Sequence, residues 1–306
     1  MIKILILLIF IFGFIFFFIK RMNQQNTHNN VSLYKIKFFS DFCDSTECKK
    51  NFEKSFENKN KNIIITDQDD FTHAILLNKA MPITNLPKEK VVGLACEPFE
   101  FLRITPEFLE YAKKNIGNYL IGDKHDLPNP FIEHFAFMWY SRPIEKNYLQ
   151  KNKVMSIVLS NKTYSSGHRY RHELVTEIQK RYLPIAIYGM GSKQYKGVNV
   201  KGEFVDEEPY NDYFFTICIE NFQSNEYISE KALNPIMRNC IPLYLGAKNI
   251  MNYIKEVILL TGNIQEDIQI ITNILLNPMK YYIVPNHENI MKHMNLFDNI
   301  TQFFDN

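Results

Sequence analysis

The sequence predicts an α/β protein with two doubly wound, Rossmann-like domains that face a cleft, preceded by an N-terminal membrane anchor helix. Short apolar runs, typical of buried strands, alternate with helical stretches along the chain. This alternation favours parallel sheets with helices on both faces. The length of 306 residues fits two domains, because domains commonly hold about 150 residues. An apolar run near the N-terminus predicts the anchor.

That apolar run covers residues 4–19, with basic residues on both sides and a single glycine inside it. As a helix it would be about 24 Å long, which is short for a membrane span but usable in a thin bilayer. A cleaved signal peptide is the alternative, but no small-residue cleavage site follows. We therefore expect a signal anchor over residues 1–21 and a short stem over residues 22–33.

The charge of the chain argues against nucleic acid as a partner. The net charge is +2, from 35 basic and 33 acidic residues. Three of the basic residues lie in residues 1–21, which hold no acidic residue, so the remainder of the chain carries −1. A body without a basic excess is not expected to bind nucleic acid.

The first expected domain covers residues 34–148. Its strand-like runs are residues 34–39, 62–66, 73–77, 91–96 and 119–121. Thr105 can cap a helix over residues 105–115, because Pro106 follows at the first helical position. A proline-punctuated aromatic segment then leads to a polar stretch over residues 142–152, where we place the boundary.

The second expected domain covers residues 149–306 and has the clearer alternation. Its expected strands are residues 154–160, 185–188, 214–220 and 241–245. Its expected helices are residues 170–182, 229–239, 264–277 and 287–304. In such sheets ligands bind beyond the carboxyl ends of the strands, so the loops after these strands are the candidate binding elements.

The densest group of functional residue types follows the strand expected over residues 214–220. Ser229 can cap the next helix, which leaves Glu230 and Lys231 in its first turn. A helix N-terminus offers backbone donors to an anion, and Lys231 adds a charge that suits a phosphate. Glu230 can accept hydrogen bonds from sugar hydroxyls. The alternative interpretation is a capped surface helix with a Glu–Lys pair.

Residues 215–246 resemble the hallmark motif of the family 10 glycosyltransferases, the α-1,3/1,4-fucosyltransferases. The matching positions are Glu220, Asn221, Tyr227, Ser229, Glu230 and Lys231, followed by a Pro-containing strand that ends in Gly246. The sequence departs from the motif at Ile219, where the family usually has Phe, and at Asn234 and Pro235 in the helix. Proline there is expected to kink or shorten the helix.

This resemblance implies a GT-B type fold and an inverting transfer of fucose from GDP-fucose to a glycan or glycoprotein hydroxyl. Asn221, Tyr227, Glu230 and Lys231 would hold the donor in the second domain, and the first domain would hold the acceptor. The motif implies no obligate cofactor or metal, and leaves stimulation by a divalent cation open. The alternatives are a GT-B transferase with another nucleotide sugar, or an inactive membrane-tethered glycan-binding relative.

Two further positions follow from the resemblance, and each has a rival. Arg171 matches the arginine that binds the donor pyrophosphate and fits the apolar spacing that follows it, with Arg169 as the alternative. Guanidinium groups suit phosphate oxygens by bidentate geometry. Glu97, directly before Pro98, resembles the acidic residue proposed as the general base, with Glu100 as the fallback.

With this resemblance, the anchor implies a single-pass, type II protein with a lumenal catalytic domain, in the Golgi or endoplasmic reticulum or at a host membrane. The sequons at Asn30 and Asn299 are then candidate N-glycosylation sites. A third sequon, at Asn161, lies at the expected donor-site strand end, where a glycan is not expected. Cys43 and Cys48 are close enough to form a disulfide or to lie together near a metal.

A competing metal motif is the sequence Asp67-Gln68-Asp69, which follows an apolar run. Such a pattern after a strand holds a divalent cation in many nucleotide-sugar transferases. A hydrated turn is the favoured interpretation, because such short acidic patterns are common by chance, and the donor motif lies in the other half of the chain. We therefore expect no metal site here.

Overall fold

The computed structural model describes residues 33–140, 150–205 and 207–305. The expected anchor over residues 1–21, almost all of the stem and Asn30 lie outside these ranges, as does most of the expected domain boundary. Among the described residues, no helix combines the length and the apolar character that a membrane crossing requires. The anchor therefore stays a prediction.

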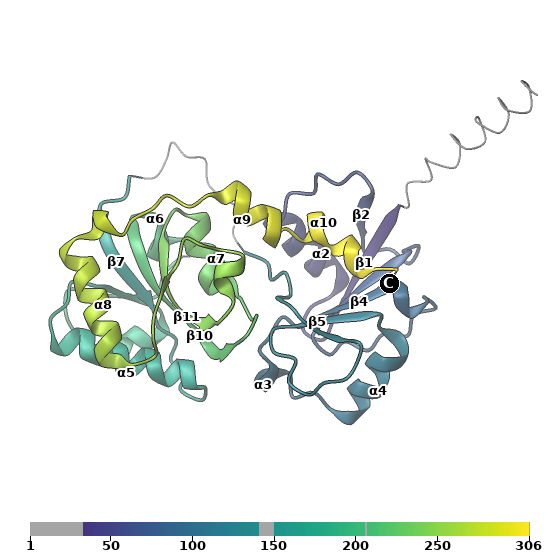
Figure 1. The fold of residues 1–306 in the computed structure, drawn as a ribbon, viewed down its shortest axis with the longest axis horizontal. Helices are drawn as coiled ribbons and strands as arrows, with labels where there is room; N and C mark the ends of the chain where they lie inside the picture. The colour runs from purple at the N-terminus through teal and green to yellow at the C-terminus, as the bar shows by residue number, and fades with distance from the viewer. Residues whose placement is uncertain (1–32, 141–149, 206, 306) are drawn as a thin grey trace, which may run out of the picture. The chain divides into compact units, whose positions relative to one another are not determined.

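Residues 35–306 form one compact unit that contains two six-stranded sheets (Figure 1). The first sheet has the order β2-β1-β3-β4-β5-β6, and its neighbouring strands from β1 to β6 are parallel. Its strands are β1 (Tyr34–Ser40), β2 (Ile63–Thr66), β3 (His73–Leu77), β4 (Val91–Leu94), β5 (Asn118–Ile121) and β6 (Phe131–Glu133). Its helices are α2 (Ser45–Ser55), α3 (Phe99–Leu102) and α4 (Pro106–Asn115).

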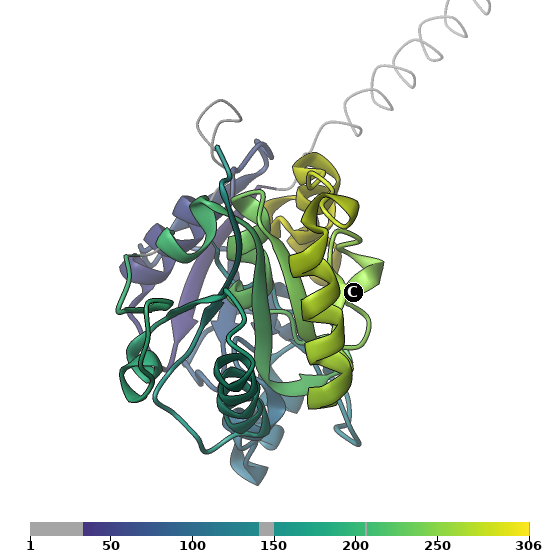
Figure 2. The ribbon, with the colours of Figure 1, turned by 90° about the vertical axis from the view of Figure 1, so that its left-hand side faces the viewer.

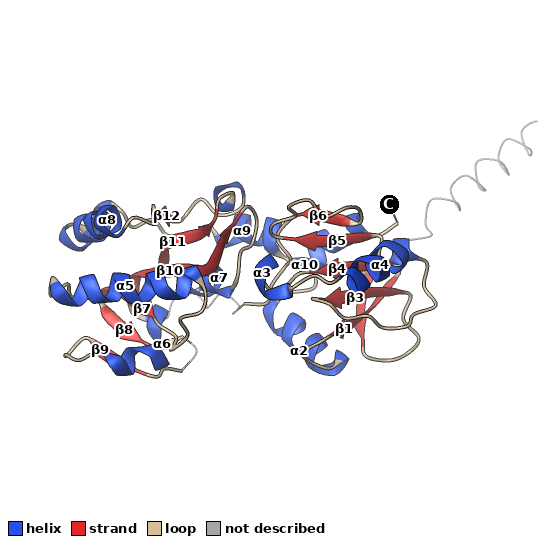
Figure 3. Cartoon of the chain, turned by 90° about the horizontal axis from the view of Figure 1, so that it is seen from below, coloured by secondary structure: helices blue, strands red, loops and turns tan. Residues whose placement is uncertain are grey.

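The second sheet has the order β12-β11-β10-β7-β8-β9, again with parallel neighbours. Figure 3 shows both sheets in red. The strands are β7 (Lys153–Val158), β8 (Ala186–Tyr188), β9 (Val200–Gly202), β10 (Tyr213–Ser224), β11 (Ile241–Ala247) and β12 (Ile258–Leu259). The helices are α5 (Ser166–Lys180), α6 (Glu208–Asn211), α7 (Glu230–Met237), α8 (Ile264–Leu276), α9 (His287–Met294) and α10 (Leu296–Asn299).

The two faces of the second sheet differ in character along its central strand, β10. Ile217 and its apolar neighbours pack with α5 and α8 in one buried core, and Figure 2 shows these two helices in front of the sheet. Thr216 faces the other side, where the hydroxyl of Ser156 in β7 donates to the carbonyl of Pro209 in α6 at 2.6 Å and lies 2.9 Å from the Thr216 hydroxyl. Because side chains alternate along a strand, one face of β10 holds the core and the other is available to a site.

The end of the chain returns to the half that contains the first sheet, residues 33–140, which we call the first half. Phe297 of α10 packs edge-on against Phe56, with 6.2 Å between the ring centroids. Asn295 donates to the carbonyl of Glu57 at 3.0 Å, and Asn118 of β5 donates to the carbonyl of Phe303 at 2.8 Å. The last helices therefore contact the first sheet's half, although they follow the second sheet in sequence.

Helix caps explain where the observed helices differ from the expected ranges. Thr105 caps α4 by accepting from the amide of Phe108, as expected. Helix α5 begins at Ser166, four residues before the expected start, because Ser165 and His168 form a capping box. Helix α7 ends at Met237, two residues early, and contains Pro235. Proline lacks the amide that a continuing helix needs.

Candidate active site

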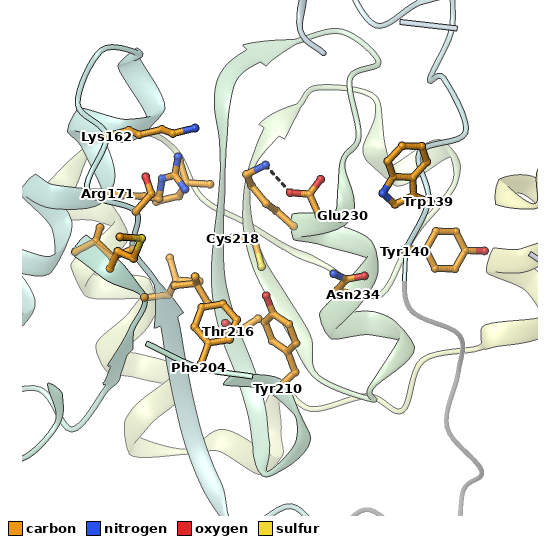
Figure 4. Close-up of a pocket in the computed structure, with 18 of the residues that line it drawn as sticks. Trp139, Tyr140, Lys162, Arg171, Phe204, Tyr210, Thr216, Cys218, Glu230 and Asn234 are labelled. Carbon is orange, nitrogen blue, oxygen red and sulfur yellow. Dashed lines mark hydrogen bonds and ion pairs between the residues drawn. The ribbon is translucent and has the colours of Figure 1, made fainter. Parts of the chain in front are cut away.

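A cavity of about 650 Å³ opens at the carboxyl ends of the strands of the second sheet (Figure 4). Its lining includes the loop after β7, the β10 face that carries Thr216 and Cys218, and the first turns of α7. Trp139 and Tyr140 line it from the first half of the chain. This position is the usual place for ligands in parallel α/β sheets.

A buried carboxylate organises the N-terminus of α7. Glu220, at 1% exposure, accepts from the amide and the hydroxyl of Ser229 at 2.9 and 2.8 Å. The Ser229 hydroxyl caps α7 by accepting from the amide of Lys231 at 3.2 Å. The Lys231 ammonium lies 3.6 Å from a Glu220 oxygen and 3.0 Å from a Glu230 oxygen. The end of β10 at Glu220, the α7 cap Ser229 and the cation Lys231 are thus connected by hydrogen bonds and ion pairs.

The two charges at the start of α7 stabilise each other. Burial pulls the pKa of Lys231 down, but the carboxylates of Glu230 and Glu220 outweigh burial and hold that pKa above its ordinary value. Burial raises the pKa of Glu230, but the ammonium of Lys231 outweighs it and the net pKa is lowered. Both side chains line the cavity, so at neutral pH it contains a fixed cation beside a fixed anion.

Arg171 supplies a second cation from α5. It is 6% exposed, lines the cavity, and donates from Nη2 to the Asn221 side chain at 2.7 Å and from Nε to the Gly167 carbonyl at 3.2 Å. Burial lowers the pKa of Arg171, and Glu220 opposes that effect. Its rival Arg169 is exposed, lies outside the lining, and donates to backbone carbonyls of the preceding loop. Arginine remains protonated in proteins, so the cavity holds at least two cations.

Gly167 allows α5 to approach β10 closely enough to place Arg171. A Cβ atom at Gly167 would lie 1.8 Å from the carbonyl oxygen of Glu220. That oxygen is backbone and cannot rotate away. A residue with any side chain would therefore push the first turn of α5 from the strand.

The structure places Glu97 and Glu100 on the first half. Glu97 follows β4, and its solvent-accessible carboxyl is partly desolvated, which raises the pKa of Glu97 above its ordinary value. The charge of Lys231 lowers this pKa and that of Glu230 raises it, so Glu97 lies within electrostatic reach of the α7 N-terminus. Glu100 is exposed on the short helix α3.

Tyr227 and Asn221 lie outside the lining of the cavity. Tyr227 is 5% exposed, and its hydroxyl donates to the carbonyl of Cys96 at 3.3 Å. Asn221 accepts from Arg171. The structure thus brings Arg171, Glu230 and Lys231 to one cavity, with Asn221 behind Arg171 and Tyr227 directed toward the first half.

The remaining candidate positions fall elsewhere. Asp69 pairs with Lys37 at 2.8 Å on the surface. Within the described ranges, no three His, Cys, Asp or Glu side chains converge as a metal site would require. Cys43 and Cys48 form a disulfide. The side-chain nitrogen of Asn299 lies 2.8–3.2 Å from three backbone carbonyl oxygens.

Sequence reasoning did not single out two features of the site. Lys162, exposed in the loop after β7, lines the cavity, and Figure 4 shows it near Arg171. Its only sequence signal was its place directly after a strand end. The anchoring role of Glu220 could have been expected from a charged residue that closes an apolar strand, because such a residue needs partners when buried.

Comparisons with known proteins show a family to which part of the chain is similar. Residues 148–259 match the family described as "Glycosyltransferase family 10 (fucosyltransferase) C-term". The matched range contains Arg171, Asn221, Glu230 and Lys231, whereas Glu97 lies outside it.

One relative and two solved structures extend the comparison. A protein of Acanthamoeba polyphaga mimivirus, named a "putative fucosyltransferase", is 25% identical over 145 residues, which is 44% of this chain and 24% of that protein. The chain thus matches about a quarter of that relative's length. A crystal structure of an α1,3-fucosyltransferase with GDP-fucose has a TM-score of 0.52 at 14% identity, covering 90% of this chain and 91% of that one. The structure with GDP has a TM-score of 0.51 at 14% identity, covering 91% and 94%. These likenesses establish a shared fold.

The contact at Gly167 generates a stability prediction. Gly167→Ala is expected to lower the free energy of unfolding by about 1–3 kcal/mol, because the new Cβ overpacks a backbone contact. Urea unfolding of the full chain measures this loss. Ser166→Ala, at an exposed position in the same helical turn, is the control and should change stability little. Equal stability of Gly167→Ala and the wild type would contradict the close packing of α5 on β10.

Proposed function

We propose that this chain transfers fucose from GDP-fucose to a glycan hydroxyl by a single inverting displacement. The observation that carries the proposal is the convergence of Arg171, Glu230 and Lys231 on one cavity at the end of the family 10 domain's central strand. The fold shared with an α1,3-fucosyltransferase solved with GDP-fucose supports the choice of donor.

The donor would lie with its diphosphate at the N-terminus of α7. Arg171 and Lys231 provide two cations from different elements, and the first turn of α7 adds backbone donors. Glu230 would accept hydrogen bonds from ribose or sugar hydroxyls. This arrangement would neutralise the charge that builds on GDP as the bond from the sugar to the phosphate oxygen breaks.

The acceptor would approach from the side of Glu97. In the transfer, the acceptor oxygen bonds to the anomeric carbon of fucose while the bond to GDP breaks. The acceptor proton passes to the carboxylate of Glu97, and GDP leaves with the bonding electrons. The raised pKa of Glu97 suits this role, because a stronger base accepts the proton more readily.

We also propose that residues 1–21 tether this activity to a membrane with residues 34–306 in a lumen. The apolar run of residues 4–19 supports the tether. The disulfide between Cys43 and Cys48 supports an oxidising compartment.

Separate alanine substitutions of the two rival arginines test the donor site. Arg171→Ala should weaken GDP-fucose binding by about 10- to 100-fold, because it removes charge-assisted hydrogen bonds. Arg169→Ala is the matched control on the same helix and should change binding by no more than about twofold. Calorimetric titration of the full chain with GDP-fucose and a panel of other nucleotide sugars gives both values.

Preference of the wild-type chain for another nucleotide sugar would contradict the proposed donor. Binding of GDP-fucose with no turnover over a broad acceptor panel would instead indicate an inactive glycan-binding relative. Weaker binding in the Arg169 variant, with the Arg171 variant unaffected, would reverse the assignment of the arginines.

The pH dependence of turnover tests Glu97 as the base. Turnover requires the carboxylate, so the rate should rise with pH through a pKa above the ordinary value of 4.5. Because Lys231 lowers the pKa of Glu97, Lys231→Ala should move this rise to higher pH, whereas Lys193→Ala, at an exposed surface pair, should not. Release of GDP from saturating GDP-fucose, with water as acceptor, measures the profile. A Glu97→Gln variant with full activity would place the base elsewhere.

A further inference from the structure

The segment between β10 and α7 crosses the carboxyl ends of three neighbouring strands of the first sheet. The hydroxyl of Tyr227 donates to Cys96 after β4 at 3.3 Å. The amide of Glu226 donates to the carbonyl of Gly122 after β5 at 2.7 Å. The Asn225 side chain reaches both oxygens of Glu133, in β6, at 3.1 Å each. We call residues 225–227 the bridging segment.

The bridging segment fits against the first sheet without a gap. A Cβ atom at Gly122 would lie 2.5 Å from the Cβ of Tyr227 and 2.6 Å from its backbone nitrogen. Only glycine therefore fits at this position without moving Tyr227. The contact joins backbone to backbone, so it constrains position more strictly than a contact between flexible side chains.

Tyr227 holds the peptide that precedes Glu97. Its hydroxyl donates a hydrogen bond to the carbonyl of Cys96, and this carbonyl belongs to the peptide unit that joins Cys96 to Glu97. From the other side, the amide of Cys96 donates to the side chain of Asn78 at 2.8 Å. Buried tyrosine hydroxyls need a partner, and this one has a backbone oxygen beside the candidate base.

The bridging segment also contacts β10, the strand that lines the donor cavity. The amide of Tyr227 donates to the hydroxyl of Ser224 at the end of β10. Two residues later, Ser229 caps α7 and is held by Glu220. A short stretch of chain therefore connects the helix turn that carries Lys231 to the peptide that carries Glu97.

We propose that Tyr227 is a positioning residue, which fixes Glu97 relative to the donor cavity instead of binding the donor. The inference rests on the proposed function, and it explains why a motif tyrosine is buried outside the cavity lining. Tyr227 acts on the reaction through the Cys96 carbonyl and does not touch the reacting atoms.

The variant Tyr227→Phe removes the hydroxyl and keeps the ring. With the full chain, we expect GDP-fucose affinity within about threefold of the wild type, and the rate of GDP release at saturating GDP-fucose, with water as acceptor, to fall about tenfold. In a Glu97→Gln background the same substitution should have almost no further effect, because residues that act through one another are not additive.

Tyr111→Phe is the matched control, because Tyr111 also donates to a backbone carbonyl, that of Pro82, at 2.8 Å. It should leave both affinity and rate unchanged. A Tyr227→Phe variant that loses affinity in proportion to rate, or that slows the Glu97→Gln enzyme as much as the wild type, would overturn the inference.

Hydrogen exchange separates this inference from the donor assignment. In ligand-free protein, Tyr227→Phe should speed amide exchange several-fold in the peptide that spans residues 95–99, and Tyr111→Phe should not. Unchanged exchange there would overturn the positioning role even if the donor is another nucleotide sugar. A wild-type chain that ignores GDP-fucose, with faster exchange in Tyr227→Phe, would overturn the proposed donor alone.

Discussion

The site depends on the buried carboxylate of Glu220 at the end of β10. A buried charge is costly without partners, and here Ser229 and Lys231 supply them. The carboxylate also needs space, which the absence of a side chain at Gly246 provides: a Cβ there would lie 2.4 Å from the Cγ of Glu220. The Glu220 carboxylate thus fixes where α7 starts, where the Lys231 side chain points and the local path of β11.

The elements that sequence predicted well are those with local signals. Strands β3 and β4 stand out as apolar runs, and Thr105 and Ser229 cap helices as expected. Helix α2 was missed because its sequence is mostly polar and only Cys48, Phe52 and Ser55 are buried. The return of α10 to the first half joins residues about 240 positions apart, and no local pattern encodes such a contact.

The sequence predicted which residues form the candidate site, but not where each of their side chains points. Motif resemblance identified Arg171, Glu230 and Lys231, which the structure gathers at one cavity. It could not show that Tyr227 points away from that cavity, since the partner of its hydroxyl, Cys96, is 131 residues distant in sequence. The apolar spacing favoured Arg171 and left Arg169 as the alternative, because helical periodicity alone does not say which face meets β10.

In the proposed function, the N-terminus of α7 and Arg171 hold the donor diphosphate. A crystal structure of the full chain with GDP tests this claim most directly. We expect phosphate oxygens within hydrogen-bond distance of Arg171 and Lys231, with the Glu230 carboxylate at the ribose. GDP bound elsewhere, with Arg171 still directed only to Asn221 and Lys231 only to its neighbouring carboxylates, would contradict the account.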